Sequence, residues 1–172
     1  MKLYDNHTHL LEEDLENPDA VSADFDAADI EKFVFLGISD PHEPQNNQNA
    51  QGLFFKRLFG DRMFYFPGCD YAFAQKGVSD ETVLDFPDQV RRMQAIGANG
   101  WKLLESKPGV RLEPLDGSFY QPLFEALEQC RLPVLWHVGD PIEFWDLNTL
   151  PAWAFPEWSY DDSVPTLESN VE

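Results

Sequence analysis

Five short apolar segments, separated from one another by helix-like patterns, constrain the fold of this chain most strongly. The last four read FVFLGI, MFYFPG, WKLL and PVLWHV, with almost no polar interruption. Continuous apolar runs of this length are typical of strands that are buried on both faces, as in parallel sheets. We therefore expect strands at 2–6, 33–38, 63–68, 100–104 and 133–138.

The segments between these strands carry helical spacing of apolar residues. One example is the segment 46–59, in which Leu53, Phe54 and Leu58 fall on one helical face. The expected helices lie at 23–31, 46–59, 80–96 and 118–130. Alternation of strands with helices predicts an α/β fold built on a parallel sheet. We expect residues 1–172 to form a single domain.

The charge and the cysteines exclude several function classes. A net charge of −19 disfavours electrostatic binding to nucleic acids or to anionic membranes. Cys69 and Cys130 lie far apart and form no CxxC motif, so we expect free thiols in a reducing compartment, although one disulfide is an alternative. No apolar leader precedes the first strand and no apolar run has membrane-spanning length. These features predict a cytoplasmic protein.

Two histidines follow the first strand directly, in the stretch DNHTHL. Side chains alternate between the faces of a strand, so His7 and His9 point to one side, with Asp5 in register behind them. His137 lies near the carboxyl end of the fifth strand, in LPVLWHVGD. Ligands bind at the carboxyl ends of strands in parallel α/β folds. We therefore expect the three imidazoles to converge on one rim.

A catalytic metal site is the chemistry that this placement predicts. Neutral imidazoles suit zinc, and also manganese, iron or nickel, and three protein ligands leave a coordination position open for catalysis. The alternative for His7 and His9 is a polar strand end. The alternative for His137 is a core histidine bonded to a carbonyl.

Lys102 and Glu105 are the candidate catalytic residues outside the histidines. Lys102 lies inside an apolar strand, where a lysine is rarely buried without a partner. It either binds an anionic substrate, carries a carbamate between two metals, snorkels to solvent or pairs with Glu105. Glu105, at the end of the same strand, either holds a metal-bound water or a polar group of the substrate, or is a surface carboxylate.

Other candidates follow the strands at the same rim. Asp5 is expected to support the site or the local structure rather than to bind a metal. His42 and Asp70 follow the second and third strands, and each is either a substrate-side residue or an exposed loop residue. Asp140 follows His137 closely and could orient its imidazole. Trp145 belongs to an aromatic segment, 140–165, which we expect to wall a pocket, the alternative being that it covers apolar surface.

Three blocks of the sequence resemble the amidohydrolase superfamily. They read DNHTHL, GANGWKLLESKP and LPVLWHVGDPIEFWD, and they extend over almost the whole chain. They resemble most closely the amidohydrolase-related branch, which includes enzymes of the aminocarboxymuconate-semialdehyde decarboxylase type. This resemblance implies a (β/α)8 barrel with one or two metals at its carboxyl face. His7 and His9 match the first two metal ligands of the family, and His137 matches the ligand at the end of strand five.

The chain departs from the family pattern after His137. The family takes a further histidine from strand six and an aspartate from strand eight, whereas all four histidines of this chain lie within its first 137 residues. The sequence supplies roughly five of the eight strand units of a barrel. It ends on SVPTLESNVE, which is typical of a helix start. We therefore expect a partial barrel, with unpaired edges at its first and fifth strands, that either forms a homo-oligomer or pairs with a missing C-terminal half.

Three functions remain open at this point. The first is a metal-dependent hydrolase acting on a small-molecule amide, ester or lactone, or a related non-oxidative decarboxylase. The second is an inactive fragment or a metal-binding remnant. The third, less favoured, is a phosphoesterase of the TatD or polymerase-and-histidinol-phosphatase type, which also opens on DxHxH. Cys69 stands where such nucleases need an acidic ligand, and the charge of −19 argues against a nuclease.

Overall fold

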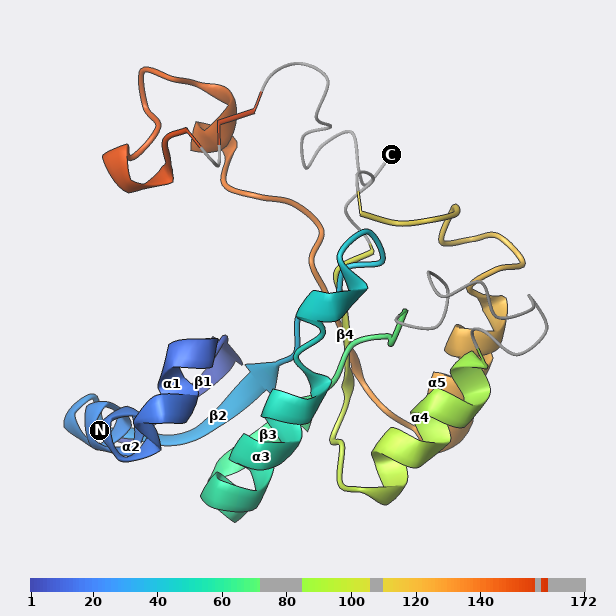
Figure 1. The fold of residues 1–172 in the computed structure, drawn as a ribbon, viewed down its shortest axis with the longest axis horizontal. Coiled ribbons are helices and arrows are strands. Elements are labelled where there is room, and N and C mark those ends of the chain that lie inside the picture. Colours follow the sequence, from blue (N-terminus) through green and yellow to red (C-terminus); the bar gives the residue numbers. More distant parts are fainter. Residues whose placement is uncertain (72–84, 106–109, 157–158, 161–172) are drawn as a thin grey trace.

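Strands and helices alternate along the chain in the computed structural model, which describes residues 1–71, 85–105, 110–156 and 159–160. Figure 1 shows the arrangement. The elements are β1 (Leu3–Thr8), α1 (Glu12–Glu16), α2 (Pro18–Ala27), β2 (Ile30–Leu36), α3 (Asn49–Phe59), β3 (Met63–Phe66), α4 (Phe86–Ala95), β4 (Trp101–Leu103), α5 (Gln121–Cys130) and β5 (Val134–Trp136). Short 3-10 turns lie at Pro44–Asn46, Gly60–Arg62, Ile142–Trp145 and Ala152–Ala154.

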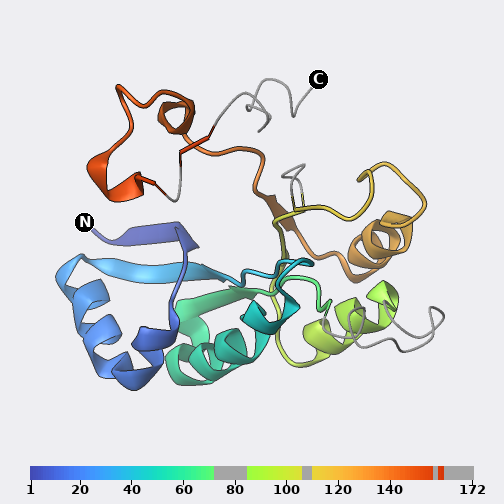
Figure 2. The same ribbon diagram turned by 45° about the horizontal axis from the view of Figure 1, so that its top comes forward.

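All strand pairs in the described ranges are parallel, which confirms the predicted α/β class. One ladder has the order β1-β2-β3 and a second pairs β4 with β5. The expected single sheet of five strands is wrong in this respect, because β3 and β4 share no regular ladder. Figure 2 shows α1, α2 and α3 along one face of the first ladder, and the orange segment 141–156 over the other face.

Hydrogen bonds join the two ladders where the regular pairing stops. The backbone amide of Asn99 donates to the carbonyl of Tyr65 over 2.8 Å, and the Asn99 side-chain oxygen accepts from the Tyr65 amide over 3.0 Å. The Lys102 amide donates to the Pro67 carbonyl over 2.8 Å. These bonds hold β4 beside β3, so the strand ends of both ladders lie next to each other.

Each ladder packs on its own helices. The first core contains Phe33, Phe35 and Tyr65 from the strands and Phe55 from α3. The second contains Trp101 and Leu103 from β4 with side chains of α4 and α5, including Val90, Leu123 and Leu127. Met93 of α4 packs against both cores. Burial of these aromatic side chains is the main stabilising term for such a fold.

Several element boundaries differ from the sequence-based expectation. β1 extends to Thr8, so His7 lies within the strand rather than after it. The helix expected at 23–31 occupies Pro18–Ala27, and the α1 turn before it was not expected. The reason is the local start signal: the Asn17 side chain accepts from the Ala20 amide over 3.3 Å, and a proline occupies the first turn.

The other expected elements are present with shifted or shorter bounds. The strands β2 to β5 and the helices α3 to α5 overlap the ranges expected for them, although residues 80–84 of the expected helix 80–96 lie outside the described part. The expected helix start in 163–172 also lies outside it. Cys69 and Cys130 are both free thiols. Among the helices of the described ranges, none has the length and apolar character needed to cross a membrane.

The close approach of α3 to the sheet depends on Gly52. An added Cβ there would lie 2.3 Å from the Tyr65 ring and 2.7 Å from the Phe35 ring. We expect Gly52→Ala to destabilise the fold by about 1–3 kcal/mol, because overpacking outweighs the gain of roughly 1 kcal/mol in helix propensity. Urea unfolding measures this change. Arg57→Ala, at an exposed position of the same helix, is the control and should change stability by no more than about 0.5 kcal/mol.

Candidate metal and acid–base site

Two imidazoles meet at the carboxyl end of β1. The Nε2 atoms of His7 and His9 lie 3.1 Å apart. The Nδ1 atom of His9 lies 3.0 Å from the Leu36 carbonyl, so in the neutral ring Nδ1 carries the proton and the lone pair is on Nε2. His7 Nε2 therefore carries a proton and donates it to His9 Nε2. The separation of the two nitrogens also fits two ligands of one cation, each about 2.0–2.1 Å from zinc, once that proton is released.

Burial favours the neutral form of both imidazoles. It lowers the pKa of His7, with further lowering by Lys102 and His137 and an opposing effect of Asp5. Burial also lowers the pKa of His9, opposed by the bond to Leu36 and reinforced by His7, Lys102 and His137. A neutral imidazole is the form that binds a metal. Lys102 and His137 therefore both lie within electrostatic range of His7 and His9.

Asp5 supports the histidine pair through the backbone and not as a third ligand. Its Oδ1 accepts from the His7 amide over 2.9 Å, and its Oδ2 accepts from the Thr8 hydroxyl over 3.0 Å. The two carboxylate oxygens therefore fix the backbone conformation at the end of β1, in which the His7 ring contacts the His9 ring.

His137 lies near the pair, but its ring is engaged elsewhere. Its backbone amide donates to the Leu103 carbonyl over 2.9 Å, which fixes the end of β5 on β4. Its Nε2 lies 2.9 Å from Asp140 Oδ1. Within the described ranges, no group of three or more His, Cys, Asp or Glu side chains is close enough to hold a metal. The structure thus brings His7 and His9 together, and His137 stands beside them without completing a three-histidine cluster.

Lys102 is buried on β4 without a hydrogen-bonding partner for its ammonium group. The residue is 1% exposed, and no described residue accepts a hydrogen bond from Nζ. Burial lowers the pKa of this amine to about 8, opposed by Glu105. Burial contradicts the alternative that the side chain snorkels to solvent. Glu105 interacts with Lys102 electrostatically, which agrees with the expected pairing, although Nζ makes no hydrogen bond to a described residue. A buried cation without a hydrogen-bonding partner is costly to the fold and marks a candidate for ligand binding.

Glu105 is also buried, which contradicts the alternative of a surface carboxylate. It is 1% exposed, and its Oε1 accepts a 2.5 Å hydrogen bond from the Tyr71 hydroxyl. No described residue bonds to Oε2. Burial raises the pKa of Glu105, opposed by the bond from Tyr71, and burial raises the pKa of Tyr71 as well. The pKa of this carboxyl is raised and that of Lys102 is lowered to about 8, so burial shifts the acid and the base toward each other.

Tyr71 belongs to the candidate site through its bond to Glu105, and the sequence pattern did not single it out. The available signal was its position two residues after Cys69 in GCDYAF. In the structure Cys69 and Tyr71 are both fully buried, whereas Asp70 between them is half-buried. Buried tyrosine hydroxyls need a partner, and an acidic residue at a neighbouring strand end is a natural one.

The remaining sequence candidates lie around this centre. His42 is exposed, and its amide donates to Asp40 Oδ1 over 2.8 Å. Asp70 is half-buried, and Gln89 of α4 bonds both its amide and its carbonyl. Trp145 is half-buried, with its ring 4.9 Å from the Tyr160 ring.

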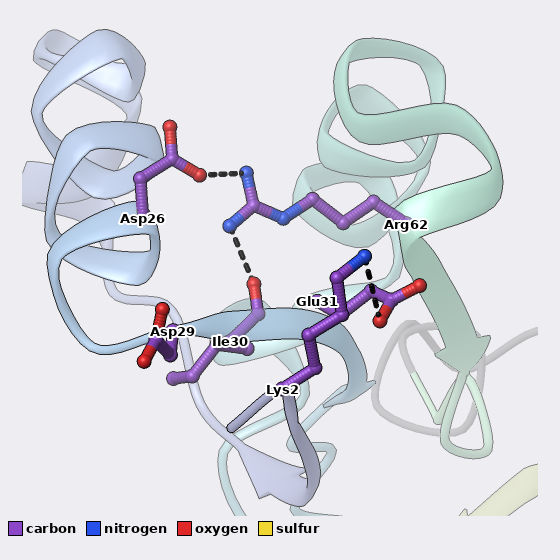
Figure 3. Close-up of a pocket in the computed structure, with 6 residues that line it drawn as sticks. All are labelled: Lys2, Asp26, Asp29, Ile30, Glu31 and Arg62. Atoms are coloured by element: carbon purple, nitrogen blue, oxygen red, sulfur yellow. Dashed lines mark hydrogen bonds and ion pairs between the residues drawn. The ribbon is translucent and has the colours of Figure 1, made fainter.

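A cavity of about 230 Å³ lies at the opposite ends of the strands (Figure 3). Arg62 lines it and pairs with Asp26 over 2.8 Å, and Lys2 pairs with Glu31 over 3.2 Å. These residues stand at the amino-terminal ends of β1, β2 and β3, away from the histidines. Ligands of parallel α/β folds bind at the carboxyl ends, so we do not assign the site to this cavity.

Comparison with solved structures supports the fold. The chain matches 5-carboxyvanillate decarboxylase from Novosphingobium aromaticivorans with a TM-score of 0.52 and 18% identity, covering 69% of this chain and 34% of that one. It matches a structure described as amidohydrolase II with a TM-score of 0.56 and 16% identity, covering 80% and 51%. It matches a putative amidohydrolase from Staphylococcus aureus with a TM-score of 0.57 and 15% identity, covering 90% and 56%.

The chain therefore has the fold of amidohydrolase-type structures over part of their length. It spans 34% to 56% of the three proteins named above. The decarboxylase structure holds manganese and 3-methoxy-4-hydroxy-5-nitrobenzoic acid. No family model and no curated protein matches the sequence.

The buried amine of Lys102 should give the protein a distinct pH dependence. Between about pH 8 and pH 10.5 the folded chain has released this proton while the unfolded chain still holds it. Stability rises with pH wherever the unfolded state binds more protons, so the free energy of unfolding should rise across this window. Urea unfolding at a series of pH values measures the slope. Lys102→Met should abolish that part of the rise.

Lys2→Met is the matched control for this measurement. It removes the same charge from a side chain that is 76% exposed, and it should leave the slope unchanged. If the free energy of unfolding rises with pH equally in wild type and in Lys102→Met, the lowered pKa of Lys102 is contradicted.

The hydroxyl of Tyr71 should contribute to stability through Glu105. Tyr71→Phe keeps the ring in the core but leaves Glu105 Oε1 without its donor. We expect a loss of about 1–3 kcal/mol, which is the cost of an unsatisfied buried polar group. Chemical denaturation measures it. Tyr4→Phe removes a hydroxyl from a ring that is 67% exposed, and equal losses in the two variants would exclude the proposed bond.

Proposed function

We propose that this chain is part of a metal-dependent hydrolase of the amidohydrolase superfamily that acts on a small-molecule amide, ester or lactone. Non-oxidative decarboxylation is the closely related alternative at the same site. The observation that carries the proposal is the pair of Nε2 atoms 3.1 Å apart, beside a buried lysine, at the carboxyl ends of parallel strands. The likeness to amidohydrolase structures supports it at the level of the fold.

We assign His7 and His9 as ligands of a divalent cation, with His137 as the third protein ligand. The donor set fits: burial favours the neutral form of both rings of the pair, and the His9 lone pair lies on the nitrogen that faces His7. Zinc is our first choice, with manganese, iron or nickel as alternatives, and the manganese in the decarboxylase supports a divalent metal. Such a cation supplies Lewis-acid activation of water and of a substrate carbonyl.

The protein groups around the pair have separate roles in this proposal. Lys102, protonated below its pKa of about 8, binds a carbonyl or carboxylate oxygen of the substrate. Glu105 exchanges a proton, held in place by Tyr71. Asp5 and Asp140 hold His7 and His137 in position. His42, Asp70 and Trp145 are assigned to the substrate side of the same rim.

We further propose that residues 1–172 form one domain of a partial (β/α)8 barrel. The strands of the first ladder carry exposed apolar side chains: Tyr4 is 67%, Leu3 42% and Phe64 39% exposed. Parallel sheets are normally covered on both faces, so these side chains favour completion of the barrel by further strands, from a second copy or from a C-terminal half. The free thiols favour a cytoplasmic location.

The second candidate function is a metal-binding remnant without catalysis. One observation favours it: among the described residues, no third ligand joins His7 and His9 closely enough to complete a metal site. Both candidates need the histidine pair to bind a cation. Only the enzyme also needs Lys102 and Glu105.

Metal content of the purified chain tests the proposal first. After incubation with zinc or manganese and desalting, we expect about one equivalent of metal in wild type by mass spectrometry, since two preformed nitrogen ligands lower the cost of binding. His7→Ala and His9→Ala should each lose at least about tenfold in affinity. The exposed His42→Ala is the control and should retain wild-type content. Metal that all three variants retain would overturn the assignment of His7 and His9.

Activity then separates the two candidates. The metal-loaded chain is assayed against panels of amides, esters, lactones and aromatic carboxylic acids. Turnover that His7→Ala and Lys102→Met both reduce by at least about a hundredfold supports the enzyme, because both groups touch the substrate or the cation in this scheme. Stoichiometric metal without turnover supports the remnant.

A further inference from the structure

A hydrogen-bonded chain links the end of β5 to the aromatic segment that follows it. The Nε2 atom of His137 lies 2.9 Å from Asp140 Oδ1, and the Tyr160 hydroxyl donates to Asp140 Oδ2 over 2.9 Å. The Asp140 side chain is only 3% exposed. A carboxylate so shielded from water depends on protein donors, and both of its oxygens have one here.

The carboxylate determines which nitrogen of His137 holds the proton. An ionised carboxylate only accepts hydrogen bonds, so the neutral imidazole must carry its proton on Nε2 and its lone pair on Nδ1. His9 is held in the opposite tautomer, because its Nδ1 faces the Leu36 carbonyl. His9 therefore has its free lone pair on Nε2, because Leu36 accepts from Nδ1. His137 has its free lone pair on Nδ1, because Asp140 accepts from Nε2.

Tyr160 reaches Asp140 because it packs against Phe144 and Trp145. Its ring centroid lies 4.9 Å from that of Trp145 and 5.8 Å from that of Phe144, and its amide donates to the Phe144 carbonyl over 2.7 Å. Phe144 is itself buried, at 2% exposed. These contacts aim the hydroxyl at a residue 20 positions earlier in the chain.

We propose that Tyr160 is a positioning residue, which sets the tautomer and orientation of the His137 imidazole by holding Asp140. The inference deepens the proposed function, since it rests on His137 belonging to that site. It also gives the aromatic segment a defined role, because the packing of Tyr160 on Phe144 and Trp145 delivers one hydroxyl to the carboxylate that controls His137. Tyr160 itself does not need to touch a substrate or a cation.

The test uses nuclear magnetic resonance on the metal-free, 15N-labelled full chain at about pH 8, where an ordinary imidazole is neutral. We expect a low-field N–H resonance on Nε2 of His137, assigned by its loss in His137→Gln. Tyr160→Phe keeps the ring contacts with Trp145 and Phe144 and removes only the hydroxyl. The Nε2–H proton should then exchange with water at least about fivefold faster, as expected when one supporting hydrogen bond is lost.

Two further variants make the outcome decisive. Asp140→Asn keeps the shape of the acceptor but removes its charge, and it should accelerate the same exchange even if Tyr160→Phe were to lose its fold. Tyr4→Phe removes an exposed hydroxyl on β1 and should leave the exchange unchanged. A His137 proton on Nδ1 in wild type, or exchange that neither Tyr160→Phe nor Asp140→Asn alters in folded protein, would overturn the proposal.

The measurement involves neither metal nor substrate. Its failure would therefore leave the assignment of His7 and His9 as metal ligands intact. Failure of the metal assay would remove the metal site that Tyr160 serves, but would not change the measured effect of Tyr160 on the His137 proton.

Discussion

Three hydrogen bonds between the end of β3 and the start of β4 hold the candidate site together. Tyr65 and Asn99 exchange two of them, and Lys102 donates the third to Pro67. Without them, the ladder that carries His7 and His9 would be separate from the ladder that carries Lys102 and His137. Hydrogen bonds of this kind are worth about 1 kcal/mol each, so the site depends on a junction of modest strength supported by Met93, which packs against both cores.

The electrostatics of the site are unusual for a chain with a charge of −19. His137 and Lys102 both lie within electrostatic range of His7 and His9, and burial lowers the pKa of His7, His9 and Lys102. Burial raises the pKa of Glu105, so the buried acid and the buried bases both shift toward neutrality. Shifts in opposite directions at one rim are typical of sites that exchange protons or bind a cation.

Much of the fold could be predicted because its signals are local. Buried strands read as apolar runs, and β2 to β5 all lie within or beside the expected ranges. The missed turn at Glu12–Glu16 has no apolar periodicity, and the early start of α2 depends on a cap at Asn17 rather than on hydrophobic spacing. The break between β3 and β4 could not be predicted, because ladder geometry depends on twist and on the Asn99 side chain.

The candidate site divides in the same way. Strand alternation alone places His7 and His9 on one side, and the structure has their Nε2 atoms 3.1 Å apart. The bond between Tyr71 and Glu105 and the bond from Tyr160 to Asp140 both join residues at least 20 positions apart. The sequence by itself thus determined which residue types stand at each strand end, because a period of two is a property of the chain. Only the tertiary structure decided which of them meet, because that depends on how the two ladders and the aromatic segment pack.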